Sequence, residues 1–191
     1  MRNLQNWLDS AMAREEYISS MTVHRENLEK VYQGFTLNEA DLVRLEKIRE
    51  QKLQSVILTA DWCGDAMVNL PIFMHIAGAA GIQEGYLIRD DNLELMDQYL
   101  TNGKSRSIPI IIWLRPDGTE AGKWGPRAPE AEEQVTELKK DLPAKDDSSF
   151  EAAFQLFASN LSDQFTENKS LWKAISEDMI SSLLAAAVDK K

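Results

Sequence analysis

The chain contains a single cysteine, Cys63, in the stretch Trp62-Cys63-Gly64-Asp65-Ala66. The apolar run 55–59 precedes it and is typical of a strand that is buried on both faces. A helix is predicted from about residue 66, so Cys63 would stand at a helix start. The unpaired N–H groups and the helix dipole at such a position favour a thiolate, which is the nucleophile in thiol–disulfide exchange.

Two acidic residues flank this cysteine. Asp61 and Asp65 oppose formation of the thiolate, because a nearby negative charge disfavours a second one. Asp65 is also explained as a residue that starts the helix, and we favour that interpretation over a role in proton transfer.

The composition limits the classes of function. The 191 residues are 43% hydrophobic and 27% charged, as in a globular protein with a sizeable core. The net charge of −10 argues against nucleic acid and against an anionic membrane surface as partners. No run of residues approaches the ~18 apolar positions of a membrane-spanning helix, and the N-terminus lacks the apolar stretch of a signal peptide. Because a lone cysteine forms no internal disulfide, we expect a cytoplasmic protein; its oligomeric state stays open.

Both ends of the chain are predicted to be helical extensions. In residues 1–39, Thr22 is expected to cap a helix that ends at Gly34, and Thr36 is expected to open a capping box for the next helix. Residues 144–191 are predicted to form two helices, at about 150–161 and 170–187, that pack on the same domain. The apolar seam of the last helix favours core packing over a partner-binding face; it consists of Trp172, Ile175, Met179 and Leu183.

Residues 40–143 are predicted to form an α/β domain. We expect strands at 55–59, 86–89, 109–114 and 120–124, and helices at about 66–79, 93–100 and 129–142. The order β-α-β-α-β-β-α predicts a central mixed sheet of about four strands, flanked by helices, in which a parallel crossover is combined with an antiparallel hairpin.

This middle segment, roughly Ala40 to Leu142, resembles the thioredoxin superfamily. Trp62-Cys63-Gly64 directly follows the buried strand, and Pro71 lies where thioredoxins kink the following helix. Ile108-Pro109 resembles the family's segment with a cis proline that lies against the reactive sulfur. Two glycines, Gly118 and Gly125, match glycines of the same stretch in the family. The resemblance implies a thioredoxin fold, here with added N- and C-terminal helices.

The motif Trp-Cys-Gly-Asp-Ala suggests a closer likeness to a group of uncharacterised bacterial thioredoxin-like proteins. Two positions depart from the usual thioredoxin pattern. Ala66 stands where the second cysteine belongs, and Ile57 stands where thioredoxins often carry a buried acid. A mixed disulfide on Cys63 would therefore need an external thiol to resolve it.

The resemblance and the lone sulfur together predict a thiol–disulfide redox protein with a single-cysteine site. Its partners would be proteins or low-molecular-weight thiols and disulfides, and whether it is an enzyme, a monothiol oxidoreductase, stays open. The alternative is a non-redox binding or chaperone-like module built on the thioredoxin fold, because Ala66 and Ile57 are apolar where redox chemistry would use polar groups.

Several residues are expected to form a substrate groove around Cys63. The backbone of Ile108, beside a cis Pro109, can pair with an extended chain, and Trp62 would offer an apolar wall. Arg106 and Arg127 could bind an anionic thiol, although each is also explained as a loop arginine that balances nearby acids. The full set of predicted substrate-binding residues is Trp62, Gly64, Asp65, Ala66, Arg106, Ile108, Pro109 and Arg127.

No cofactor or metal is expected. His24 and His75 are too scattered along the sequence to complete a zinc site with Cys63. A cluster shared between two one-cysteine chains, which some relatives of this fold form, has no specific support in the sequence.

Overall fold

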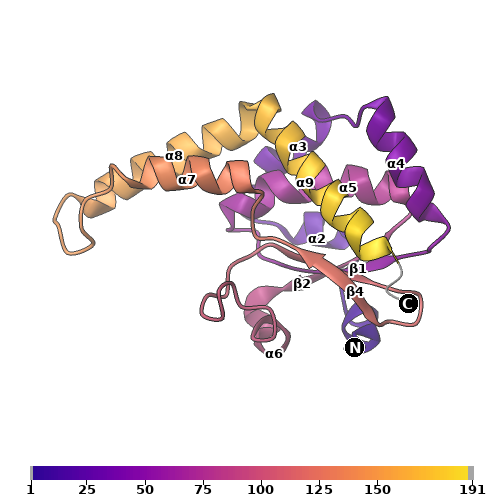
Figure 1. Ribbon diagram of the computed structural model, residues 1–191. Helices are drawn as coiled ribbons and strands as arrows, with labels where there is room; N and C mark the ends of the chain where they lie inside the picture. Colours follow the sequence, from indigo (N-terminus) through magenta and orange to yellow (C-terminus); the bar gives the residue numbers. More distant parts are fainter. Residues whose placement is uncertain (1, 189–191) are drawn as a thin grey trace.

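A computed structural model describes residues 2–188 (Figure 1). Its centre is a four-stranded sheet in the order β2-β1-β3-β4, with the strands β1 Gln54–Thr59, β2 Gln83–Ile88, β3 Ile110–Leu114 and β4 Glu120–Trp124. β1 pairs in parallel with β2 and antiparallel with β3, and β3 pairs antiparallel with β4. All of β3 is buried, as its uninterrupted apolar sequence predicts. The expected mixed α/β sheet is confirmed.

The helices of the middle segment position the cysteine. α5 Gly64–Ala80 follows β1, contains Pro71 and is almost entirely buried, and Gly81 ends it in the left-handed conformation that glycine favours. α7 Pro129–Lys139 follows β4, with a proline in its first turn.

The connection from β2 to β3 is less helical than predicted. A 3₁₀ turn, η1 Arg89–Asp91, is followed by the short helix α6 Leu93–Met96. The predicted end of this helix at Leu100 is wrong, because the chain passes into tighter turns after Met96: the N–H groups of Gln98 and Tyr99 donate to the carbonyls three residues before them. The side chain of Asn92 donates to the carbonyl of Ile88, and it makes no capping hydrogen bond to the helix.

Four helices precede the sheet: α1 Gln5–Asp9, α2 Arg14–Ser20, α3 Arg25–Gly34 and α4 Glu39–Arg49. Thr22 does not cap α3, because its backbone and hydroxyl groups donate to Asp61. Asn38 rather than Thr36 caps α4, by accepting a hydrogen bond from the backbone of Asp41. Met12, which follows α1, pairs with Tyr86 at the edge of the sheet.

The two C-terminal helices are α8 Phe150–Glu167 and α9 Lys169–Ala187. The seam predicted for α9 is buried, and α9 packs on β4, α5 and α7. In Figure 1, α7 and α8 run side by side as a hairpin that projects beyond the sheet, while α9 crosses over β4. Within residues 2–188, none of the helices has the length and apolar character needed to span a bilayer.

Candidate functional site

Cys63 occupies the junction between β1 and α5. It is the N-cap residue of α5, and its Sγ donates a hydrogen bond to the carbonyl oxygen of Ile108 at 3.3 Å. The Ile108–Pro109 peptide bond is cis. Only 7% of Cys63 is exposed. The sulfur therefore lies directly beside the cis-proline segment, but it is largely covered.

The surroundings of the sulfur favour the thiol over the thiolate. Burial raises the pKa of Cys63 to about 11, and the negative charge of Asp65 acts in the same direction. The backbone N–H groups of Ala66 and Asp65 and the guanidinium of Arg127 oppose this shift without reversing it. The stabilisation that a helix start gives a thiolate is present, but desolvation outweighs it.

The two flanking carboxylates are engaged differently. Asp61 turns toward the N-terminal segment, where it accepts hydrogen bonds from the backbone N–H groups of Thr22 and Val23 and from the Thr22 hydroxyl. Burial opposes ionisation of Asp61, but these hydrogen bonds lower its pKa below the ordinary value. Burial raises the pKa of Asp65, although Arg127 partly offsets this effect.

Arg127 holds Asp65 in a bidentate ion pair. Nε and Nη2 of Arg127 donate to the two carboxylate oxygens of Asp65 at 2.6 and 2.7 Å, and Nη1 donates to Glu132 at 2.6 Å. Both partners of the first pair are mostly buried, with side-chain exposures of 19% and 12%. The guanidinium that could bind an anionic thiol is thus already shared between two carboxylates.

The other predicted arginine is also paired. Arg106 makes a bidentate ion pair with Asp97, at 2.6 and 2.8 Å. Trp62 is 48% exposed, and the guanidinium of Arg89 lies 4.6 Å from the centroid of its ring. Arg89 also donates to the carbonyl of Arg106. The sequence did not identify Arg89 as a site residue. Arg89 directly follows β2, and no local pattern indicates that its side chain contacts Trp62.

A cavity of about 470 Å³ opens at the sulfur. It brings together six of the predicted residues: Trp62, Cys63, Asp65, Arg106, Ile108 and Arg127. Ala66 and Pro109 are buried, and Gly64 faces a second cavity, of about 400 Å³, that Cys63 also lines. Cys63 therefore lines both cavities, together with Trp62, Asp65 and Arg127.

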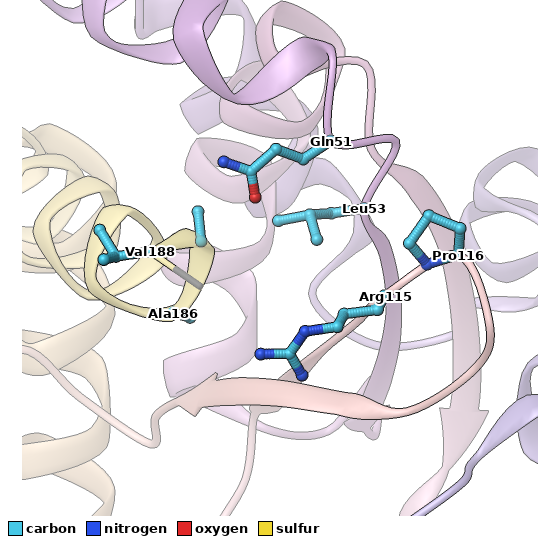
Figure 2. A pocket seen from close by; sticks show the side chains of 7 residues that line it. Gln51, Leu53, Arg115, Pro116, Ala186 and Val188 are labelled. Carbon is cyan, nitrogen blue, oxygen red and sulfur yellow. The ribbon is translucent and has the colours of Figure 1, made fainter. Parts of the chain in front are cut away.

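A larger cavity of about 530 Å³ lies away from this site, between Leu53, Arg115, Pro116 and the end of α9 (Figure 2). Among the described residues that line it, none is a cysteine, histidine or carboxylate. The chemistry that the chain offers is therefore at Cys63 rather than in the largest of these spaces.

The two histidines lie in different places. His75 is not among the residues that line either cavity beside Cys63, and it stacks on Tyr32 with ring centroids 4.3 Å apart. His24 precedes α3 in a left-handed conformation and lines the second cavity. Within residues 2–188, no three His, Cys, Asp or Glu side chains are grouped so that they could hold a metal ion.

The chain is similar to two solved structures over most of its length. It is 14% identical to a Pseudomonas aeruginosa protein of unknown function; the match covers 97% of this chain and 99% of that chain, with a TM-score of 0.69. An HIV epitope-scaffold protein is 15% identical, with 97% of each chain covered and a TM-score of 0.65. These two likenesses concern the fold alone. No curated protein matches the chain in sequence.

A protein-family model described as thioredoxin matches residues 11–139. The match includes the whole sheet, the cysteine and the cis proline, while α8 and α9 lie beyond it. The chain, with its one buried cysteine, therefore belongs to the thioredoxin family.

Proposed function

We propose that the chain performs thiol–disulfide exchange with Cys63 as its single nucleophile. The observation that carries this proposal is the position of Sγ, 3.3 Å from the carbonyl oxygen of Ile108 and beside the cis Ile108–Pro109 bond, in a residue that lines two cavities. A cysteine with a purely structural role in the core is not expected to line two cavities.

The exchange proceeds in two steps. Cys63 first loses its proton to solvent, and the thiolate attacks one sulfur of a substrate disulfide; a mixed disulfide forms while the other sulfur leaves as a thiolate and takes up a proton. Ala66 offers no second thiol. An external thiolate therefore attacks the substrate sulfur of the mixed disulfide. The sulfur–sulfur bond to Cys63 breaks, a new disulfide joins the external thiol to the substrate fragment, and Cys63 leaves as a thiolate that takes up a proton.

The raised pKa makes the resting site slow. With a pKa of about 11, only about one molecule in 10⁴ carries a thiolate at pH 7. A thiolate of high pKa is the stronger nucleophile, which offsets part of this loss. The site is therefore suited to selected disulfides that its cavities bind, rather than to rapid reaction with every accessible disulfide.

The partners that we propose are proteins or low-molecular-weight disulfides and thiols. The N–H of Ile108 has no hydrogen-bond acceptor within residues 2–188, so it is available to pair with an extended substrate. The Trp-Cys-Gly-Asp-Ala motif supports a place in the bacterial group of thioredoxin-like proteins with this sequence. We place the protein in the cytoplasm, where thiols stay reduced.

Intact-mass measurement after incubation with a small disulfide tests the proposal. At pH 9, we expect one adduct on the wild type, none on Cys63→Ser, and loss of the adduct when a small thiol is added. Absence of an adduct on the wild type under native conditions, with labelling only after unfolding, would contradict exchange at this site.

A non-redox binding module is the second candidate, and burial of Cys63 with its raised pKa favours it. Recovery of partner proteins on immobilised wild type and Cys63→Ser separates the two functions. Equal recovery by both forms under reducing conditions supports binding without chemistry. Loss of every partner with the serine form contradicts this candidate.

A further inference from the structure

The second cavity beside Cys63 is an apolar groove that α8 completes. Met67 of α5 and Val135 of α7 form one side, and Phe154, Phe157 and Leu161 of α8 form the other. Its volume of about 400 Å³ is sufficient for one large side chain with its neighbours. Cys63 and Trp62 also line this groove, so it is adjacent to the reactive residue.

The α8 wall is an addition to the thioredoxin unit. α8 follows the family-matched segment, which ends at residue 139. Along α8, Phe150, Phe154 and Phe157 form a row with successive ring centroids 5.8 Å apart. Phe154 is 43% exposed. A large aromatic side chain at the edge of a groove that a nucleophile also lines indicates a contact with the substrate.

We propose that this groove, defined by Met67, Val135, Phe154, Phe157 and Leu161, holds an apolar side chain of an extended polypeptide whose neighbouring cysteine reacts with Cys63. The inference rests on the proposed exchange function and gives its substrate class. The substrate would be a disulfide-linked protein segment with an aromatic or large aliphatic residue close to its cysteine.

The position of Cys63 in the lining of both cavities favours a polypeptide over a small thiol. A small disulfide would fill only one of the cavities, whereas an extended chain passes over Cys63 and enters both. On the side away from α8, the unpaired N–H of Ile108 can bind the substrate backbone. Successive side chains of an extended segment point to opposite sides, which allows one of them to enter the groove while the backbone stays at Ile108.

The charge at the rim of the groove adds a second feature. Lys139 lines the groove and makes no ion pair within the described part of the chain. Arg127 at the same rim is already occupied by Asp65 and Glu132. A segment with an acidic residue beyond its apolar side chain would therefore match the groove better than a basic segment.

The test uses three probes that carry the same thionitrobenzoate leaving group. Two are six-residue acidic peptides that differ only in phenylalanine or serine beside the cysteine; the third is cysteine alone. Release of thionitrobenzoate at pH 9 measures attack by Cys63, with Cys63→Ser giving the background. For the wild type, we expect the phenylalanine peptide to react about tenfold faster than the serine peptide, as expected for one apolar contact.

Phe154→Ser and Leu156→Ser form a matched pair of variants. Both residues are exposed on α8, at 43% and 66%, but only Phe154 lines the groove. We expect the preference for phenylalanine to fall to about twofold or less in Phe154→Ser and to persist in Leu156→Ser, with unchanged far-ultraviolet circular dichroism in both.

The outcomes separate this inference from the exchange function. If none of the probes reacts above background, both proposals are overturned. Reaction of the two peptides at equal rates, or a preference that Phe154→Ser retains in full, overturns the groove alone. Equal rates for free cysteine and the phenylalanine peptide overturn the polypeptide as its occupant.

Discussion

The pH dependence of Cys63 reactivity follows directly from the burial of its sulfur. A pKa of about 11, against about 8.5 for an unperturbed cysteine, lowers the thiolate fraction at pH 7 about 300-fold. The greater nucleophilicity of a more basic thiolate recovers about tenfold. The net reactivity toward a small reagent should thus be about 30-fold below that of a free thiol, before any steric cost.

Asp65 and Asp61 provide a matched pair of perturbations. Both flank Cys63 in sequence, but only the charge of Asp65 raises the pKa of the thiol. Asp65→Asn removes that charge and leaves the guanidinium of Arg127 near the sulfur, so the pKa of Cys63 should fall. We expect the pKa to fall by about one unit, which raises the thiolate fraction at pH 8 about tenfold; because the less basic thiolate is a weaker nucleophile, alkylation should become about threefold faster. Asp61→Asn should leave the rate unchanged.

Alkylation by iodoacetamide, followed by intact mass from pH 6 to 11, measures both effects. For the wild type, the logarithm of the rate should rise with unit slope to pH 10 without a plateau. A plateau near pH 8.5 or lower would refute the reasoning, because the sulfur would then titrate as an exposed thiol. Equal acceleration by Asp65→Asn and Asp61→Asn would refute the assignment of the charge effect to Asp65.

Three further predictions concern stability and gain of function. Between pH 8.5 and 11 the unfolded chain releases the Cys63 proton that the folded chain retains. The free energy of unfolding, measured with urea, should therefore fall over this range by up to about 3 kcal/mol relative to Cys63→Ser. A difference in unfolding free energy between the two proteins that does not change with pH would contradict the raised pKa. Ala66→Cys places a second thiol in the first turn of α5. We expect this variant to reduce protein disulfides without an added small thiol and to form an internal disulfide, which intact mass detects as a loss of two hydrogens. If the variant shows neither the reduction nor the internal disulfide, the rest of the site is not competent for exchange. A Cβ on Gly125, at φ +118°, would lie 2.2 Å from the carbonyl oxygen of Pro109, so Gly125→Ala should lower the free energy of unfolding by about 3 kcal/mol. Gly103, at φ +67°, has open space around it, so Gly103→Ala should lower the same free energy by about 1 kcal/mol. Equal losses of stability in the two variants would contradict the close approach at Gly125.

The sheet could be predicted because its signals are local. The apolar runs that became β1 and β3 lie between polar residues, and the turn at Pro116-Asp117-Gly118 joins β3 to β4. Gly81 and Pro129 mark a helix end and a helix start through their own backbone preferences. The cis Ile108–Pro109 bond beside the sulfur was expected from the family resemblance and is present.

The misplaced caps near the N-terminus have a tertiary cause. Thr22 has the chemistry of a cap, but Asp61, 39 residues away, takes its hydrogen bonds. Local propensity is a weak influence that a contact across the fold overrides.

The electrostatics of the site could not be read from the sequence. The Asp65–Arg127 ion pair joins residues 62 positions apart, and burial of Cys63 beneath the Ile108 segment depends on the packing of two loops. The sequence correctly identified the opposing influences of the helix start and the acidic neighbours. Which influence prevails depends on desolvation, a property of the assembled structure.

Turnover by substoichiometric protein tests the central role of Cys63 most directly. At pH 9, the protein is mixed with an excess of a peptide disulfide and an external thiol, and the released peptide thiol is counted. We predict several turnovers per molecule of wild type and only the uncatalysed rate with Cys63→Ser. Equal rates for the two forms would contradict exchange at this sulfur.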